Sequence, residues 1–371
     1  MSPLSELSPV ESLKANSEVL VSGGVCAVGP FLFAYGNNGL IRNSDVNNPI
    51  YWVNANSENW QFNPGLTNDV NVCNSKIVKG ISYRGASNYA ALFWSLDSLI
   101  LASFIGAPAV FNYTIVATNI SIIAPNSVVE RSGEYFWIGD GRFFRFAGGQ
   151  LSEVPNHQNR NWFFSNVNKS REHLIWASLN PEYNEIWWFF PFGNSEECNH
   201  ALIYNYEEQV WYDTEINRGA GVYSSVLARP IWVSNEVVNQ QYEVFVHETG
   251  NSYITKNGTA YAIPSYFVTP DLGNLSNPQN GSPKQQGGWL QNWSYIFRVE
   301  PGEWDLSVGT KRFANNVYKY TNYTFDSKTE KIDMKEQGRL MNFKISSKSI
   351  NSDFYMGDFM LTTDLGDSEG F

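Results

Sequence analysis

Reactive residue types are scarce in this chain of 371 residues, and their scarcity argues against several kinds of site. The three cysteines, Cys26, Cys73 and Cys198, lie far apart with no C-x-x-C pair, which argues against a disulfide framework and a cysteine-based zinc site. The four histidines stand alone, without the spacing that orients two ligands on one metal. No P-loop, G-x-S-x-G elbow or dinucleotide-binding glycine motif occurs. We therefore expect no metal, no cofactor and no catalytic residue, and we predict that the chain is not an enzyme.

Charge is also in short supply. Only 16% of the residues are charged, below the usual quarter, and the net charge is −11. Sequence-independent binding of nucleic acid needs clustered Lys and Arg, and the sequence has no such run. No apolar run is long enough to span a membrane, and the first residues lack the pattern of a secretory signal. We expect a soluble protein that does not hold DNA tightly but could let it pass.

What the chain has in abundance is aromatic strands separated by turns. It is 43% hydrophobic and 15% aromatic, which is enough for a large buried core. Each repeated unit is an apolar run of strand length, a turn rich in Gly, Asn, Asp or Ser, and a second such run. We predict five such hairpins, centred on residues 31–42, 91–103, 134–147, 185–205 and 243–255.

The spacing of these hairpins predicts an all-β fold. They recur at intervals of about 40 to 60 residues, the range of one four-stranded propeller blade. We expect a short N-terminal arm over 1–24 and a β-propeller of about five to six blades over 25–371, with the C-terminal β-unit 289–371 as the candidate for closing the ring. Residues 269–288 predict an exposed loop and 170–177 a short helix. A β-sandwich is the alternative fold.

Acidic turn tips are the candidates for chemistry. Asp97, Asp140 and Glu248 could form the acid/base set of a propeller glycosidase, but no arginine cluster accompanies them and Asp140 is accounted for as a turn residue. The aromatic runs 162–164 and 187–190 could stack on sugars or bases, but such runs are more typical of buried strands. Trp289 and Trp293, beside the expected loop, are candidates for docking a partner.

The order of motifs over residues 90–213 resembles the tail nozzle proteins of short-tailed bacteriophages, the family that includes the tail tubular B-type and packaged-DNA stabilisation proteins. The motifs that carry the resemblance include Ile123–Asn126, Trp137–Gly141, Asn184–Pro191 and Tyr204–Trp211. The resemblance implies a β-propeller that assembles as a ring, usually of six copies, around the channel for the genome. It implies no catalytic residue, because the family carries none.

The resulting hypothesis is a structural protein of the virion tail, assembled in the host cytoplasm. It would form a homo-oligomeric ring that retains the packaged genome and passes it on during ejection, without specific binding of the double-stranded DNA. An adaptor or portal-proximal protein would bind one side and a tail fibre or distal tip the other, and Asp97, Asp140 and Glu248 would face the channel. The alternatives are a carbohydrate-binding or glycoside-cleaving propeller in host receptor recognition, and a scaffold propeller in a cellular complex.

Overall fold

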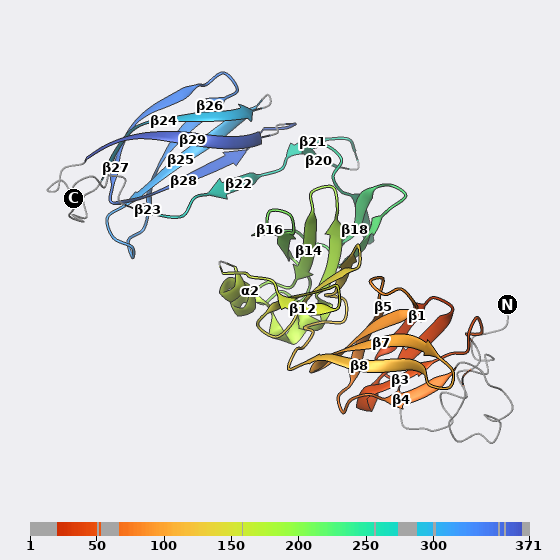
Figure 1. Cartoon of the computed structure of the whole chain (residues 1–371). Coiled ribbons are helices and arrows are strands. Elements are labelled where there is room, and N and C mark those ends of the chain that lie inside the picture. The colour runs from red at the N-terminus through yellow and green to blue at the C-terminus, as the bar shows by residue number, and fades with distance from the viewer. Residues whose placement is uncertain are drawn as a thin grey trace, which may run out of the picture. The chain divides into compact units, whose positions relative to one another are not determined.

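The computed structural model of the protein is all-β and divides into two compact units, residues 1–247 and 248–371 (Figure 1). The structure describes residues 21–49, 52, 67–157, 159–255, 257–273, 288–299, 302–347, 349–351 and 354–365. Among these residues, no helix has the length and apolar character needed to cross a bilayer. The all-β fold class predicted from the sequence is confirmed.

The first unit consists of antiparallel sheets in which each strand pairs with the next along the chain. The first two sheets contain β1 (Gly24–Val28), β2 (Phe31–Tyr35), β3 (Leu40–Asn43) and β4 (Asn68–Asn71), then β5 (Ile77–Ser82), β6 (Ala90–Ser95), β7 (Ser98–Gly106) and β8 (Val110–Thr118). The third and fourth contain β9 (Val129–Arg131), β10 (Glu134–Ile138), β11 (Phe143–Ala147) and β12 (Gln150–Glu153), then β13 (Trp176–Asn180), β14 (Glu185–Phe190), β15 (His200–Asn205) and β16 (Val210–Glu215). The last has three strands, β17 (Ala220–Ser224), β18 (Arg229–Val238) and β19 (Gln241–Val246).

Turn chemistry explains why the hairpins form where the sequence places them. Between β10 and β11 the chain reverses at Gly139–Arg142, where the Gly139 N–H donates to the Arg142 carbonyl at 2.8 Å and Gly141 takes a φ of 68°. Glycine adopts this conformation without steric cost. Hairpins β2–β3, β6–β7, β10–β11 and β14–β15 confirm the first four predictions.

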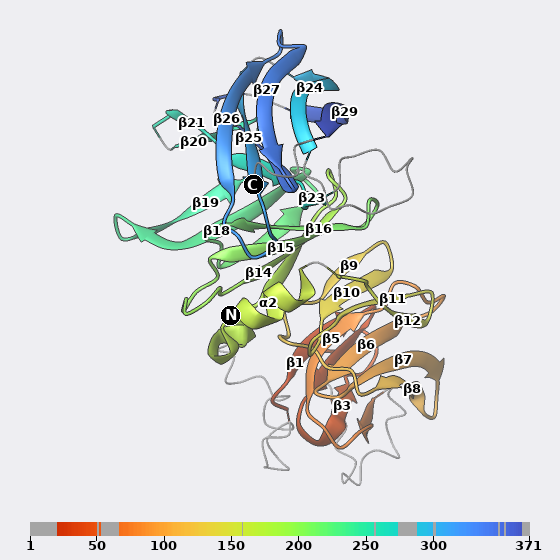
Figure 2. The same ribbon diagram turned by 90° about the vertical axis from the view of Figure 1, so that its left-hand side faces the viewer.

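Consecutive sheets of the first unit share apolar cores. A separate cluster of buried side chains joins each sheet to the next, and Figure 2 shows two of the sheets, β5–β8 and β9–β12, side by side. Each cluster contains a fully buried aromatic ring, in chain order Phe93, Trp137, Trp188 and Trp232. Burying such rings supplies about 2–3 kcal/mol each. Among the described residues no cluster joins β17–β19 to β1–β4.

Apart from one short two-stranded sheet, the second unit is built from two sheets packed face to face. Its short strands are β20 (Ser252–Ile254), β21 (Ala260–Ala262), β22 (Ser265–Val268) and β23 (Leu272–Gly273). One sheet has the order β22, β28 (Leu340–Ser347), β25 (Glu303–Lys311) and β26 (Lys319–Asp326), with β23 also on β28; the other has β27 (Lys331–Gly338), β24 (Gly288–Val299) and β29 (Phe354–Leu365). Alternate residues of β25 and β28 point into a core that also takes Ile332 and Met334 of β27.

The domain boundary differs from the expectation of a single propeller over 25–371. The chain divides after His247, inside the hairpin predicted at 243–255, because β19 pairs with β18 and β20 pairs with β21. In the described part of 289–371, strands pair with one another and with strands at 265–273. Of the predicted arm 1–24, residues 1–20 lie outside the described residues, as do 274–287 of the predicted loop 269–288.

Among the described residues, helical structure is confined to short segments. The aromatic run 162–164, expected in a buried strand, lies in helix α2 (Arg160–Asn166). The helix expected over 170–177 is instead the 3-10 helix η4 (Lys169–Leu174), and Trp176 already belongs to β13. Another 3-10 turn, η2 (Asn37–Gly39), connects β2 to β3. The segment from α2 to η4 connects β12 of the third sheet to β13 of the fourth and lines a pocket of the first unit.

Candidate functional site

The structure places the predicted residues in three different settings. Asp97 lies in the turn between β6 and β7, and Asp140 in the turn between β10 and β11. Glu248 begins the second unit in a left-handed conformation with a φ of 60°. Trp289 and Trp293 are in β24, opposite Gln337 and Ile332 of β27, but their side chains lie outside what the structure describes. Their docking role, and the channel-facing role of the three acidic residues, stay predictions.

Asp97 is held by a ring of serine hydroxyls. Its Oδ1 accepts hydrogen bonds from Ser75 Oγ at 2.6 Å, Ser95 Oγ at 2.8 Å and Ser98 Oγ at 3.0 Å. These bonds, the one from Ser75 first, hold the pKa of the Asp97 carboxyl below its usual range, because they favour the ionised form. Ser75 precedes β5, so the carboxylate ties the β6–β7 turn to the start of its own sheet. Asp97 therefore acts in the structure as a turn-fixing group.

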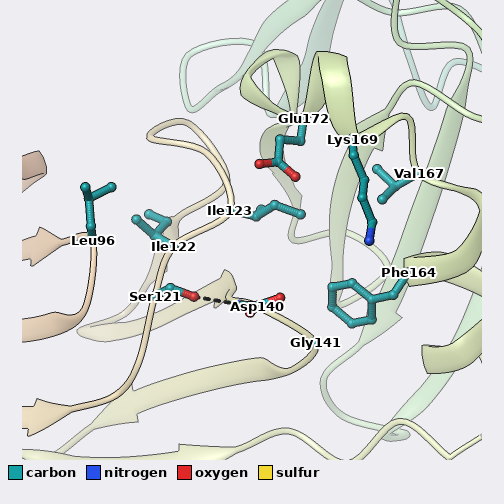
Figure 3. A pocket seen from close by; sticks show the side chains of 10 residues that line it. All are labelled: Leu96, Ser121, Ile122, Ile123, Asp140, Gly141, Phe164, Val167, Lys169 and Glu172. Carbon is teal, nitrogen blue, oxygen red and sulfur yellow. Dashed lines mark hydrogen bonds between the residues drawn. The ribbon is translucent and has the colours of Figure 1, made fainter.

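A pocket of about 290 Å³ opens beside this turn, within the first unit (Figure 3). Four segments line it: the β6–β7 turn at Leu96, the connection after β8 at residues 121–123, the β10–β11 turn at residues 140–141, and the stretch from α2 into η4. In antiparallel sheets every second connection lies at the same end, which is why segments from different sheets meet here. The pocket thus brings Asp140 together with residues that lie far from it in the sequence.

Hydrogen bonds fix the Asp140 side of the pocket. The Asp140 N–H donates to Ser121 Oγ at 2.8 Å, and Trp137 Nε1 donates to the Ser121 carbonyl at 3.1 Å. Trp137 is fully buried, so it anchors the Ser121 connection to the sheet below. The bond to Ser121 uses the backbone N–H of Asp140. Among the described residues the carboxylate of Asp140 has no partner, so it can contact a ligand.

The opposite side of the pocket is fixed by a helix cap. Asn168 Oδ1 accepts from the Ser170 N–H at 3.1 Å and from Ser170 Oγ at 2.7 Å, which starts η4. Asn168 Nδ2 donates to the Ser195 carbonyl at 2.9 Å and so connects η4 to the loop between β14 and β15. This framework places Lys169 and Glu172 on the pocket wall.

The pocket presents charges of both signs above an apolar base. Figure 3 shows Asp140, Lys169 and Glu172 directed toward the same space, with Phe164 beside them. Within the described part of the chain, none of these three charged side chains makes a hydrogen bond or an ion pair. Carboxylates accept hydrogen bonds and an ammonium donates them, so the site can contact a ligand that carries both donors and acceptors. The sequence indicated Asp140 and, within the aromatic run 162–164, Phe164, but it gave no signal for Lys169 or Glu172.

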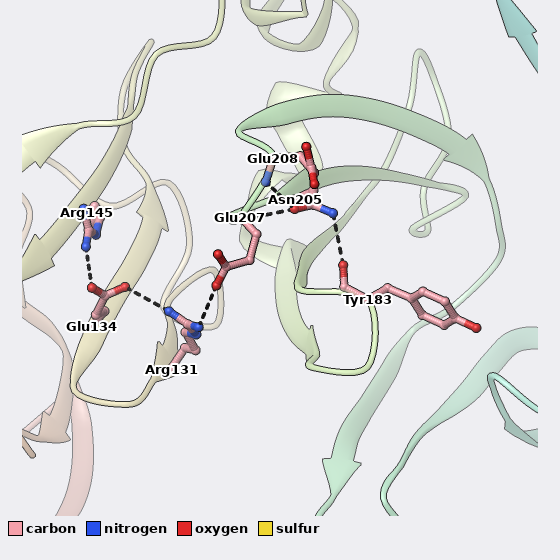
Figure 4. Close-up of polar contacts among 7 residues, drawn as sticks. All are labelled: Arg131, Glu134, Arg145, Tyr183, Asn205, Glu207 and Glu208. Atoms are coloured by element: carbon pink, nitrogen blue, oxygen red, sulfur yellow. Dashed lines mark hydrogen bonds and ion pairs between the residues drawn. The ribbon is translucent and has the colours of Figure 1, made fainter. Parts of the chain in front are cut away.

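A network of ion pairs connects the third sheet to the fourth and holds the two together (Figure 4). Arg131 lies 3.6 Å from Glu134 and 3.3 Å from Glu207, and its guanidinium stacks over Tyr206 at 4.1 Å. Glu134 also pairs with Arg145. Every acidic and basic group in this network has a partner, so it offers a ligand no free charge.

Two of the three cysteines are partly or fully buried and have unreactive thiols. Burial raises the pKa of both Cys26 and Cys198 to about 12, so these thiols stay protonated at neutral pH. In the part of the chain that the structure describes, no three His, Cys, Asp or Glu residues are grouped so that they could hold a metal ion.

His247 ends the first unit in a desolvated position. Its Nε2 accepts a hydrogen bond from Arg218 Nε at 3.1 Å, and its ring lies 4.2 Å from that of Trp232. Burial first, and then the Arg218 charge, lower the pKa of His247 from 6.5 to about 4. The imidazole is therefore neutral in the folded protein at neutral pH.

We expect the first unit to lose stability as the pH falls from 7 to 5. Between pH 6.5 and 4 the unfolded chain binds a proton at His247 that the folded chain does not, so the free energy of unfolding decreases by up to about 2 kcal/mol by pH 5. Urea unfolding at both pH values measures this. His247→Gln keeps an acceptor for Arg218 but cannot titrate, so its pH dependence should be weaker by that amount. Equal pH dependence in the two proteins would contradict the assignment.

The comparisons with known proteins give no family. No family model and no curated protein matches the sequence. Among solved structures, the fold is similar to an exo-β-1,3-galactanase from Phanerochaete chrysosporium with β-1,3-galactotriose, at a TM-score of 0.31 and 10% identity, covering 94% of this chain and 97% of that one. A second, described as a glycoside hydrolase, has a TM-score of 0.26 and 6% identity, covering 90% and 97%. The resemblance to tail nozzle proteins stays a prediction.

These similarities correct one expectation. Both solved structures are glycoside hydrolases, which contradicts the prediction that the chain is not an enzyme, and we do not retain it. At TM-scores of 0.31 and 0.26 the likeness carries no argument for a reaction or a substrate. Any activity therefore has to be argued from the side chains of the chain itself.

Proposed function

We propose that the chain is a structural subunit of a short-tailed phage tail, a nozzle protein that assembles with copies of itself into a ring. In this proposal the sheets of the first unit are the blades of a propeller. The ring surrounds the path of the genome and has six copies, the usual number in the family that the sequence resembles. Its neighbours would be an adaptor or portal-proximal protein and a tail fibre or tip protein. The motifs that resemble the family lie on strands β6–β16, within the row of sheets.

The observation that carries the proposal is an exposed apolar face on the last sheet of the row. Trp232 faces the fourth sheet, where its Nε1 donates to Ser178 Oγ at 3.1 Å. The other face carries Val222 opposite Ile231, and Val233 opposite Val244. Val222 and Val244 are each 63% exposed. Contiguous exposed apolar side chains on a sheet typically mark a contact surface for another protein.

The other end of the row supports a second copy as the occupant of that face. Val25 of β1, in the first sheet, is 63% exposed, and Ala27 on the same strand is also exposed. When two different apolar surfaces of one molecule pair between copies, the contact is head to tail, and it closes into a ring if the rotation permits. The net charge of −11 suits a conduit, since it disfavours tight binding to the DNA that passes.

Substitution of the exposed face tests the proposal. We expect the purified protein to form rings or higher oligomers, visible in negative-stain electron micrographs and in sedimentation velocity. Val222→Asp with Val244→Asp should weaken self-association at least tenfold, because two side chains that contribute about 1 kcal/mol each on burial are replaced by desolvated charges. Val317→Asp, at a position 93% exposed in the second unit, is the matched control. A wild-type protein that stays monomeric at high concentration would contradict the proposal.

A glycan-directed function is the second candidate. The pocket with Asp140, Glu172 and Lys169 favours it, because a binding module or a glycosidase needs carboxylates directed into a concave site. Of the two aromatic runs that could stack on a sugar, neither Trp162 nor Trp187 lines the pocket, and Trp188 is fully buried. The half-buried Phe164 is the aromatic group in their place.

A further inference from the structure

We infer that the pocket between the β6–β7 turn, the β10–β11 turn and η4 is a binding site for a neutral saccharide unit. This inference does not depend on the proposed assembly role; it rests on the second candidate, the glycan-directed function of the same pocket, and names the class of ligand. The pocket lies within the first unit, and its volume of about 290 Å³ is just below the range of roughly 300–1,000 Å³ for small-molecule sites. It therefore suits a ligand of about one sugar ring, with neighbouring rings of an oligosaccharide outside.

The charges of the pocket select against ionic ligands of either sign. An anionic ligand, such as a phosphate or an acidic sugar, would meet the carboxylates of Asp140 and Glu172. A cationic ligand, such as a lysine or arginine side chain, would meet the Lys169 ammonium. A neutral ligand with several hydroxyl groups avoids both penalties, because each hydroxyl can donate to a carboxylate and accept from the ammonium.

The apolar part of the pocket fits the other half of a sugar. Ile122 is buried and Ile123 and Val167 complete an aliphatic base, while the Phe164 ring is half-buried at the side (Figure 3). A pyranose has one face made of C–H groups and an edge made of hydroxyls, so the C–H face can lie on Phe164 while the hydroxyls reach the charged groups. Sites of this kind combine an apolar lining with a few placed polar groups.

The polar groups are held ready for a ligand. The turn that bears Asp140 is tied to Ser121 through the backbone N–H, and the η4 helix that bears Glu172 is capped by Asn168. A site whose groups are positioned before binding loses less entropy when the ligand arrives. No partner among the described residues competes for the three charged side chains.

Ligand-observed NMR of the full chain tests the inference. The probes are glucose, galactose, N-acetylglucosamine and their β-linked trisaccharides, each against glucuronate as the anionic comparison. We expect saturation transfer to at least one neutral sugar, with a Kd near or below about 1 mM, and weaker transfer to glucuronate. Asp140→Asn and Glu172→Gln should each raise Kd about tenfold or more, since hydrogen bonds to a charged group are stronger than those to a neutral amide.

Matched controls separate binding from folding. Asp140→Asn retains the backbone bond to Ser121, so its unfolding midpoint should equal that of the wild type. Glu208→Gln removes an exposed carboxylate on the β15–β16 turn, outside the pocket, and should leave Kd unchanged. Release of reducing ends from the trisaccharides by wild-type protein, and its loss in Asp140→Asn, would support the site and add cleavage to binding. No transfer from any neutral probe, tighter binding of glucuronate, or a Kd that neither pocket variant changes would overturn the inference.

Discussion

Gly39→Ala is expected to destabilise the first unit by about 3 kcal/mol or more, or to prevent its folding. Gly39 has a φ of 67°, which side chains with a Cβ rarely adopt. A Cβ at this position would lie 2.0 Å from the carbonyl oxygen and 2.5 Å from the nitrogen of Cys73. Both are backbone atoms, and the Val72 N–H donates to the Gly39 carbonyl at 3.0 Å, so neither chain can move away without breaking the pairing of β3 with β4. Urea unfolding followed by circular dichroism gives the loss.

Gly148→Ala is the matched control for this prediction. Gly148 also has a left-handed φ, of 57°, but a Cβ there would meet nothing within 4 Å. Its replacement should cost only the conformational penalty of about 1 kcal/mol. The difference between the two variants therefore measures the close approach of Gly39 to Cys73. If both variants lost the same stability, Gly39 would not lie close to the Cys73 backbone in solution.

Trp188→Ala should lower the free energy of unfolding of the first unit by about 3–5 kcal/mol. The side chain is 1% exposed and lies in the core between the third and fourth sheets, where Phe143 and Trp211 pack against it. Removing a large buried ring loses its transfer free energy and leaves a cavity that the neighbouring strands can fill only in part. A loss below 1 kcal/mol would mean that this core is not closely packed.

Trp188→Phe divides that loss into packing and hydrogen bonding. The Trp188 Nε1 donates to the buried Ser127 carbonyl at 2.8 Å, and phenylalanine keeps a ring but removes the donor. An unsatisfied buried carbonyl costs about 1–3 kcal/mol, so this variant should fall between the wild type and Trp188→Ala. Thermal unfolding of the three proteins in one buffer measures both steps.

Local turn chemistry explains which hairpins could be predicted. At Asn37–Gly39, at Asp97 and at Gly139–Gly141 the tip residues themselves favour the reversal, and the apolar runs on both sides pair across it. The run around Thr249–Asn251 has the same composition, but the strands beside it pair with β18 and β21 instead. A turn signal does not specify which neighbour a strand chooses, since the partner depends on distant residues.

Short aromatic runs were the least predictable elements. Trp187–Phe190 forms a buried strand as expected, whereas Trp162–Phe164 forms part of a helix. Both runs read alike, because three or four apolar residues are too few to distinguish a period of 2 from one of 3.6. For 170–177, Asn168 caps the start of the 3-10 helix η4, but Trp176 and Ala177 pair with β14 and so end the helix early.

The pocket could be predicted only in part for a related reason. Asp140 carries a signal in the sequence because it stands in a glycine turn. Lys169 and Glu172 lie some thirty residues further along, in a segment whose meeting with that turn depends on how the third and fourth sheets pack. No local sequence pattern specifies that the β10–β11 turn and η4 meet in space.

Indole N–H groups give the row of sheets a property that apolar packing alone lacks. Apolar contact is non-directional and tolerates small translations of one sheet over another. Trp188 bonds to Ser127 on the connection before β9, and Trp232 to Ser178 on β13, so each of these junctions also has a directional bond that fixes the sheets along the strand direction. A force along the strands must break these hydrogen bonds before one sheet can slide over the next. The resistance of the first unit to shear should therefore reside in these few tryptophans.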